Sequence, residues 1–247
     1  MDEIRTGLMG GTGTGTGTGT GKDDSASASP DVHKLTRSVI SCINLLDKNY
    51  VLLSRIAYEA AQLGSYLPEI LGVAPLTSLM TEMFSRLEEK LVSMSHSSFQ
   101  FQFQSQCDSL GILFLINNSH FIWQQLHPMF DMAFPMAVLN RKIDDYIQSY
   151  LQVSWGPVLS CLYYDPGPLR RGRYSSALPL FEFEFHKVYR TQRFWKVPDP
   201  ELRGRLRKAI TNKVTSGLKK FLEDKNVTTP RITPQELEDM LQELFEG

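Results

Sequence analysis

The chain has 247 residues, of which 42% are hydrophobic, and its formal net charge is −1. Beyond residue 30 it is long and apolar enough to bury a substantial core, which excludes a chain that is disordered throughout. The balanced total excludes a uniformly basic or acidic protein, yet residues 186–231 contain thirteen Lys or Arg against four Asp or Glu.

The N-terminal segment GGTGTGTGTGTGK, residues 10–22, is similar in composition to a glycine-rich phosphate-binding loop. A dinucleotide turn needs glycines at i, i+2 and i+5, which a two-residue repeat cannot supply. The P-loop pattern fails because Thr16 replaces its first glycine and Asp23 replaces its Mg²⁺-binding hydroxyl residue. We therefore predict that residues 1–29 form a disordered Gly/Thr/Ser-rich tail and that residues 30–247 form the folded domain.

Beyond the tail, the hydrophobic pattern is mainly helical. Apolar residues recur at three- and four-residue steps over residues 35–53, 76–94 and 139–150. The segments around Pro75, Pro166 and Pro168 break this pattern and predict loops.

Two short segments alternate like strands. FQFQFQ, residues 99–104, is ambiguous, and we place it in a loop or at a helix start. FEFEF, residues 181–185, belongs to a longer pattern in which Phe181, Phe185 and Tyr189 share one helical face and Phe183 departs from it. This pattern favours a helix over residues 181–193.

The C-terminal segment carries clear signals for the start of a helix. Thr233 is a predicted N-cap, Pro234 suits the first helical position, and Glu236 can complete a capping box. An apolar stripe follows over about twelve residues, too few for a stable isolated helix, so the segment must dock on neighbours. The sequence as a whole predicts an all-α fold.

The three cysteines, Cys42, Cys107 and Cys161, lie more than fifty positions apart, so they form no CxxC pair. We interpret them as small buried residues in a reducing compartment. The longest apolar run, ILFLI at residues 112–116, is far shorter than a membrane span, and the start of the chain has no signal-peptide core. We expect a soluble intracellular protein.

Groups that could perform catalysis do not converge in the sequence. His120 and His127 could share a helix face, but no carboxylate or cysteine at helical spacing completes a metal set. The serines lie in no GxSxG motif. We predict no catalytic residue, no cofactor and no metal site, and hence no enzyme.

The most informative segment is PDPELRGRLRKAITNKVTSGLKKFLEDK, residues 198–225. Its apolar residues keep one helical stripe: Leu202, Leu206, Ile210, Val214, Leu218 and Phe221. Its basic residues fill much of the remainder: Arg203, Arg205, Arg207, Lys208, Lys213, Lys219 and Lys220. Such a helix buries one side and presents a cationic side to solvent.

Three interpretations of this cationic side stay open. Its charges could pair with acidic neighbours, face an anionic membrane, or bind nucleic acid. Nucleic acid ranks below the membrane because no aromatic residues alternate with the basic ones as stacking platforms. Four or five basic residues at about 1 kcal/mol each would give only about millimolar membrane affinity, which is useful to a subunit held there several times over.

Five stretches carry a family resemblance, in this order: HKLTRSVISCINLL, LFLINNSHFI, YLQVSW with VLSCL, VYRTQRFWKVPDPELR and TPQELEDMLQELFEG. From residue 29 onward they resemble the C-terminal half of plant members of the Exo-seventy family, a subunit of the exocyst vesicle-tethering complex. The resemblance implies stacked antiparallel helical bundles forming part of an elongated rod, and no catalytic activity. It also implies a C-terminal surface that binds phosphatidylinositol bisphosphate at the plasma membrane.

The chain departs from the family pattern at several positions. Members carry two lipid-contacting basic residues three positions apart before the last helix; Thr228 stands at the first and Arg231 at the second. Arg205 lies where the plant pattern is usually acidic. Gly156 and Pro157 interrupt a helix that relatives continue, and we expect a kink there. The glycine-threonine tail stands in place of the family's N-terminal half.

Our leading hypothesis is a cytoplasmic exocyst subunit, peripherally associated with the plasma membrane, that tethers secretory vesicles. The expected partners are other exocyst subunits and anionic inositol phospholipids, with small GTPases as a further class and no nucleic acid. The predicted lipid-binding residues are Arg203, Arg205, Arg207, Lys208, Lys213, Lys219, Lys220 and Arg231. The alternative is a shortened paralogue that acts as an interaction decoy or regulator without binding lipid.

Overall fold

A computed structural model describes residues 30–70, 72–97, 104–127, 136–163, 177–228 and 230–247. The predicted tail and most of the FQFQFQ segment lie outside these residues. The helices are α2 (Lys34–Lys48), α3 (Tyr50–Gln62), α4 (Pro75–Ser97), α5 (Gln104–Leu126), α6 (Met136–Ser160), η1 (Cys161–Tyr163), α7 (Ala177–Gln192), α8 (Pro200–Asp224) and α9 (Pro234–Leu241). The predicted all-α class is confirmed.

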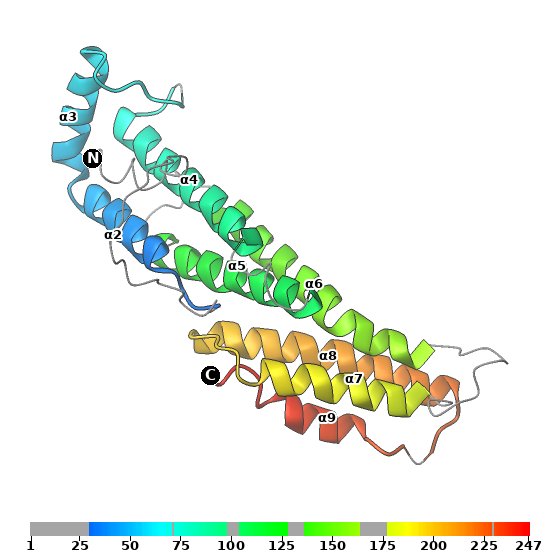
Figure 1. The fold of residues 1–247 in the computed structure, drawn as a ribbon. Coiled ribbons are helices and arrows are strands. Elements are labelled where there is room, and N and C mark those ends of the chain that lie inside the picture. The colour runs from blue at the N-terminus through cyan, green and yellow to red at the C-terminus, as the bar shows by residue number, and fades with distance from the viewer. Residues whose placement is uncertain (1–29, 71, 98–103, 128–135, 164–176, 229) are drawn as a thin grey trace, which may run out of the picture.

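The helices form an elongated stack (Figure 1). Helices α2 to α5 lie at one end and α7 to α9 at the other, and α6 packs against α5 at the first end and against α7 and α8 at the second. Gly217 allows a close approach of α8 to α6, because a Cβ atom there would lie 2.5 Å from Leu159 Cδ2. The long helix α6 therefore connects the two ends through continuous packing.

The first predicted apolar stripe is divided between two helices. Asn49 ends α2 and begins α3. Helix α2 buries Val39, Ile40 and Ile43, whereas α3 has no buried residue. Periodicity alone could not show this break, because Tyr50 and Leu53 keep the spacing and pack against the core while only partly buried.

A buried asparagine fastens the start of α2 to α5. Asn118, which has no exposed surface, accepts hydrogen bonds at Oδ1 from His33 N at 2.9 Å and Thr36 Oγ1 at 2.7 Å. Its Nδ2 donates to the carbonyl oxygens of Asp31 and Phe114. All of its polar capacity is thus used within the protein, as burial of an amide requires.

The predictions for α7 and for the start of α9 are confirmed, whereas the predicted length of α9 is wrong. Helix α7 has the predicted buried face, with Phe181, Phe185 and Tyr189 inside and Phe183 exposed. The Thr233–Glu236 capping box of α9 is also present. However, α9 ends after eight residues. Beyond its end Leu244 and Phe245 are both fully buried, and Phe245 adopts a positive φ of 66°, which lies outside the right-handed helical region.

Two further expectations concern α6 and the cysteines. Helix α6 contains Gly156 and Pro157 and continues to Ser160, so they do not end the helix, and the kink at Pro157 stays a prediction. Of the three cysteines, Cys42 and Cys161 are partly exposed rather than buried, and their thiols are free. Partial burial nevertheless raises the pKa of both thiols above the usual value.

His120 is a packed histidine at the junction of α5 and α8. It is 6% exposed, and its Nε2 lies 3.5 Å from Asp199 Oδ1 without making a hydrogen bond. Asp199 is the N-cap of α8, accepting a hydrogen bond from Leu202 N at 2.7 Å. Burial lowers the pKa of His120 despite the opposing charge of Asp199.

This environment predicts a loss of stability at acid pH. Below the ordinary imidazole pKa of about 6.5, the unfolded chain binds a proton that folded His120 does not, so the stabilisation is present above this pH and is lost below it. We expect the melting temperature to fall between about pH 7 and pH 5.5 and to fall less steeply in His120→Gln. The exposed His127, just past the end of the same helix, provides the control. A pH slope that is reduced equally by His127→Gln would contradict this assignment.

Candidate membrane-binding surface

Helix α8 has the predicted amphipathic form. The six residues of its apolar stripe are all buried, and its cations lie outside that stripe. The cap by Asp199 and the proline at the first helical position fix where the helix begins. The position of this helix and its buried side were therefore predicted correctly from the sequence.

Half of the predicted lipid-binding residues have internal acidic partners. Arg203 Nη1 lies 3.4 Å from Glu246 Oε2, and Lys219 Nζ lies 3.8 Å from Glu238 Oε1. Arg205 pairs with Asp144 on α6, and Arg207 pairs with Glu246. Each of these four would have to give up an ion pair before binding a lipid phosphate.

Arg207 is the most deeply engaged of them. Its side chain is only 16% exposed, and its Nε and Nη2 donate to the Leu244 carbonyl oxygen at 2.9 and 2.6 Å. The hydrogen bond and charge of Arg207 lower the pKa of Glu246. This guanidinium thus holds the C-terminal segment against α8. In the same segment, Glu246 forms an isolated β-bridge with Lys196.

The other four predicted residues are Lys208, Lys213, Lys220 and Arg231. Within the part of the chain that the structure describes, they have no ion-pair partner. Arg231 lines a hollow of about 350 Å³ whose other walls come from α7. These four residues thus come from α8 and from the segment that precedes α9.

The walls of this hollow include residues that the sequence-based prediction omitted. Phe183, His186 and Arg190 contribute to it, together with Glu182 as an acidic group. A signal was available, since Phe183 departs from the buried face of its helix and the positive excess begins at residue 186. Apart from Arg231, the prediction named only residues of α8, because the basic residues of that helix are the most closely spaced.

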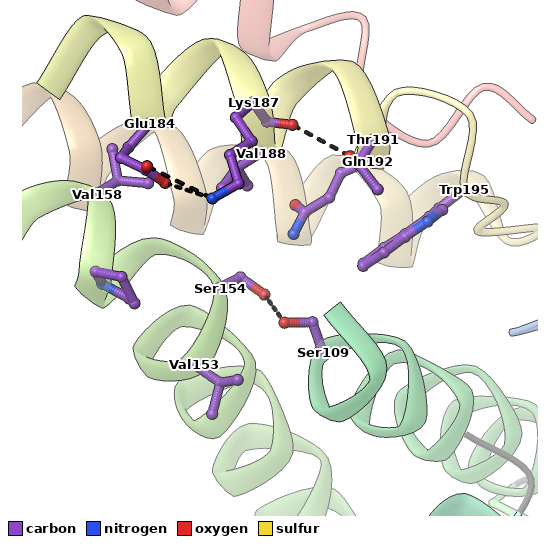
Figure 2. A pocket seen from close by; sticks show the side chains of 11 residues that line it. Ser109, Val153, Ser154, Val158, Glu184, Lys187, Val188, Thr191, Gln192 and Trp195 are labelled. Carbon is purple, nitrogen blue, oxygen red and sulfur yellow. Dashed lines mark hydrogen bonds and ion pairs between the residues drawn. The ribbon is translucent and has the colours of Figure 1, made fainter. Parts of the chain in front are cut away.

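A second pocket lies between α6 and α7 (Figure 2). It has a volume of about 180 Å³, and its polar groups largely satisfy one another. Ser154 Oγ donates to Ser109 Oγ at 2.8 Å, and Lys187 Nζ pairs with Glu184 at 3.1 Å. Pro157 forms part of its wall. No serine or histidine in this lining is arranged as a nucleophile and base.

Two other kinds of site are absent from the described residues. No cluster of three or more His, Cys, Asp or Glu side chains is arranged to hold a metal ion. None of the helices has an apolar stretch long enough to cross a bilayer.

Comparison with known proteins gives a family for this architecture. The family model described as the C-terminal part of the Exo70 exocyst complex subunit matches residues 20–243. The chain belongs to the Exo70 family. The resemblance carried by the five sequence stretches is thereby confirmed.

Curated Exo70 relatives from Arabidopsis thaliana support the assignment. Exocyst complex component EXO70E2 is 28% identical over 224 residues, covering 87% of this chain and 34% of that protein. EXO70C1 is 24% identical over 56% of this chain and 24% of its own length, and EXO70A1 is 24% identical over 87% and 36%. The chain thus spans about a third of EXO70E2 and EXO70A1, and about a quarter of EXO70C1.

The contacts of Arg207 predict a structural role. Arg207→Met leaves the Leu244 carbonyl without its charged donor and should lower the free energy of unfolding by about 2 kcal/mol. Arg205→Met removes the same charge from a more exposed pair and should cost less than about 1 kcal/mol. Urea denaturation of both variants measures the difference, and equal costs would show that Arg207 does not fasten the C-terminal segment.

Proposed function

We propose that the chain acts as an exocyst subunit in exocytosis, helping to tether secretory vesicles to the plasma membrane through inositol phospholipids and protein contacts. Family membership supports the exocyst part of this proposal. The observation that carries the lipid part is that Lys208, Lys213, Lys220 and Arg231 are left without internal ion pairs in the described structure. These cations can meet lipid phosphates without breaking an internal contact.

The expected affinity of one molecule is low. Each basic residue near an anionic surface contributes about 1 kcal/mol, so four of them support roughly millimolar binding. Such weak attachment suits a subunit of an assembly, because several weak contacts held together give high overall affinity. The proposed role therefore depends on both lipid and protein contacts.

Charge reversal tests the lipid contact. Lys220→Glu combined with Arg231→Glu should lower the affinity for vesicles containing phosphatidylinositol bisphosphate by at least about thirtyfold, since two favourable contacts of about 1 kcal/mol each are lost and two repulsive charges are added. Vesicle cosedimentation measures this change. The matched control is Lys48→Glu with Arg141→Glu, two exposed positions on α2 and near the start of α6.

The control separates a specific surface from general charge. An equal loss of binding in both double variants would contradict the assignment to these cations. Absence of binding by the unaltered chain would reject the lipid function and leave the second candidate below.

The second candidate function is that of a protein-interaction decoy or regulator without lipid binding. The exposed side of α3 favours it, because Leu52 and Ile56 are 66% and 54% exposed and no residue of this helix is buried. The relatives are described as exocyst complex components. An apolar helical surface of another exocyst subunit is therefore the partner that we assign to α3.

Polar substitution on α3 tests this contact. Leu52→Ser with Ile56→Ser should lower the capture of purified exocyst subunits by the tagged chain about tenfold or more, because both side chains would be buried in such an interface. The exposed Val138 on α6 serves as the control, as Val138→Ser. Unchanged capture would show that α3 is not the contact.

A further inference from the structure

One exposed phenylalanine lies on helix α7, and another lies just past its end. Phe183 is 60% exposed and Phe194, just past the end of the helix, is 69% exposed. They lie eleven positions apart, which is three helical turns, and Arg193 N still donates to the Tyr189 carbonyl in helical fashion. The other phenylalanines of the helix, Phe181 and Phe185, are fully buried. The exposed rings therefore mark a distinct side of α7.

Basic residues stand between and beside these rings. Lys187 and Arg190 fall between them at helical spacing, and the Arg193 guanidinium lies 5.2 Å from the centre of the Phe194 ring. We name this surface the α7 outer face and define it by Phe183, Lys187, Arg190, Arg193 and Phe194, together with Arg231 across the hollow.

Only some of the positive charge of this face is neutralised. Lys187 pairs with Glu184, and Arg193 Nη2 lies 3.9 Å from Glu243 Oε2. Arg190 and Arg231 have no ion-pair partner within the described residues, although Glu182 lines the same hollow. By contrast, the three arginines of α8 are all engaged by internal carboxylates. Unpaired guanidinium groups are thus found on α7 and beside it.

The spacing of these groups indicates what binds them. The buried centre of a protein–protein interface is depleted of charged residues other than Arg. Here the order at helical spacing along the chain is Phe, Lys, Arg, Phe, so a lysine as well as an arginine lies between the two rings. A lipid interface accommodates this mixture, because aromatic rings enter the boundary of the acyl region while basic groups remain at the phosphates.

We propose that the α7 outer face lies on the anionic bilayer, with the rings of Phe183 and Phe194 inserted between lipid headgroups. This inference rests on the proposed lipid function and specifies how it is achieved. Insertion adds an apolar contribution that salt does not screen, so attachment no longer depends on charge alone. A protein partner for this face is the competing possibility that the test must exclude.

The test is cosedimentation of the full chain with vesicles of phosphatidylcholine, phosphatidylserine and phosphatidylinositol bisphosphate. Phe183→Ser with Phe194→Ser should lower the affinity about tenfold and should abolish the binding that the unaltered chain retains at about 0.5 M salt. Because both rings are exposed, the melting temperature should not change. The matched control is Val51→Ser with Leu63→Ser, which removes side chains that are 89% and 81% exposed at the α3 end of the molecule.

The outcomes separate the two proposals. Loss of salt-resistant binding in the phenylalanine variant alone supports insertion. Binding by the unaltered chain that is unchanged in the phenylalanine variant overturns the insertion proposal and leaves the lipid function intact. Failure of the unaltered chain to bind vesicles rejects both the lipid function and the inference.

Discussion

The bond between Arg207 and the end of the chain organises the C-terminal half of this structure. A single guanidinium satisfies the Leu244 carbonyl and the Glu246 carboxylate, so the chain leaves α9 after Leu241 and buries Leu244 and Phe245. Charge-assisted hydrogen bonds of this kind are among the stronger polar contacts in proteins. One consequence is that Arg207 serves mainly to hold the fold together, while Arg203 and Arg205 are engaged in more exposed ion pairs.

That internal use of charge changes which basic residues are available for the proposed membrane contact. Lysines on α8 and Arg231 remain available, and the α7 outer face adds guanidinium groups and exposed rings. Helix α3 lies at the far end of the stack (Figure 1), and its Leu52 and Ile56 are exposed. Separate ends for lipid and protein contacts would allow an elongated member of the Exo70 family to bridge two surfaces, and each weak contact would reinforce the other.

Most of the fold could be predicted from local rules. Helical periodicity gave α7 and α8, and the Thr233–Glu236 pattern gave the start of α9, because each signal depends on neighbours within a few residues. The pairing of charges could not be predicted. Asp144 and Glu246 lie 61 and 39 positions from Arg205 and Arg207, so only tertiary packing brings them together. For the same reason, the sequence could not predict that Arg231 lies beside α7.

The most direct test of this account observes the arginine side chains themselves. Nitrogen-15 NMR of the Nε–H groups can be recorded before and after addition of a soluble short-chain phosphatidylinositol bisphosphate. The account predicts a slowly exchanging Arg207 Nε–H signal that does not move on lipid addition, while the Arg190 and Arg231 signals shift. A large shift of the Arg207 signal with none at Arg190 and Arg231 would contradict it and return the lipid site to α8.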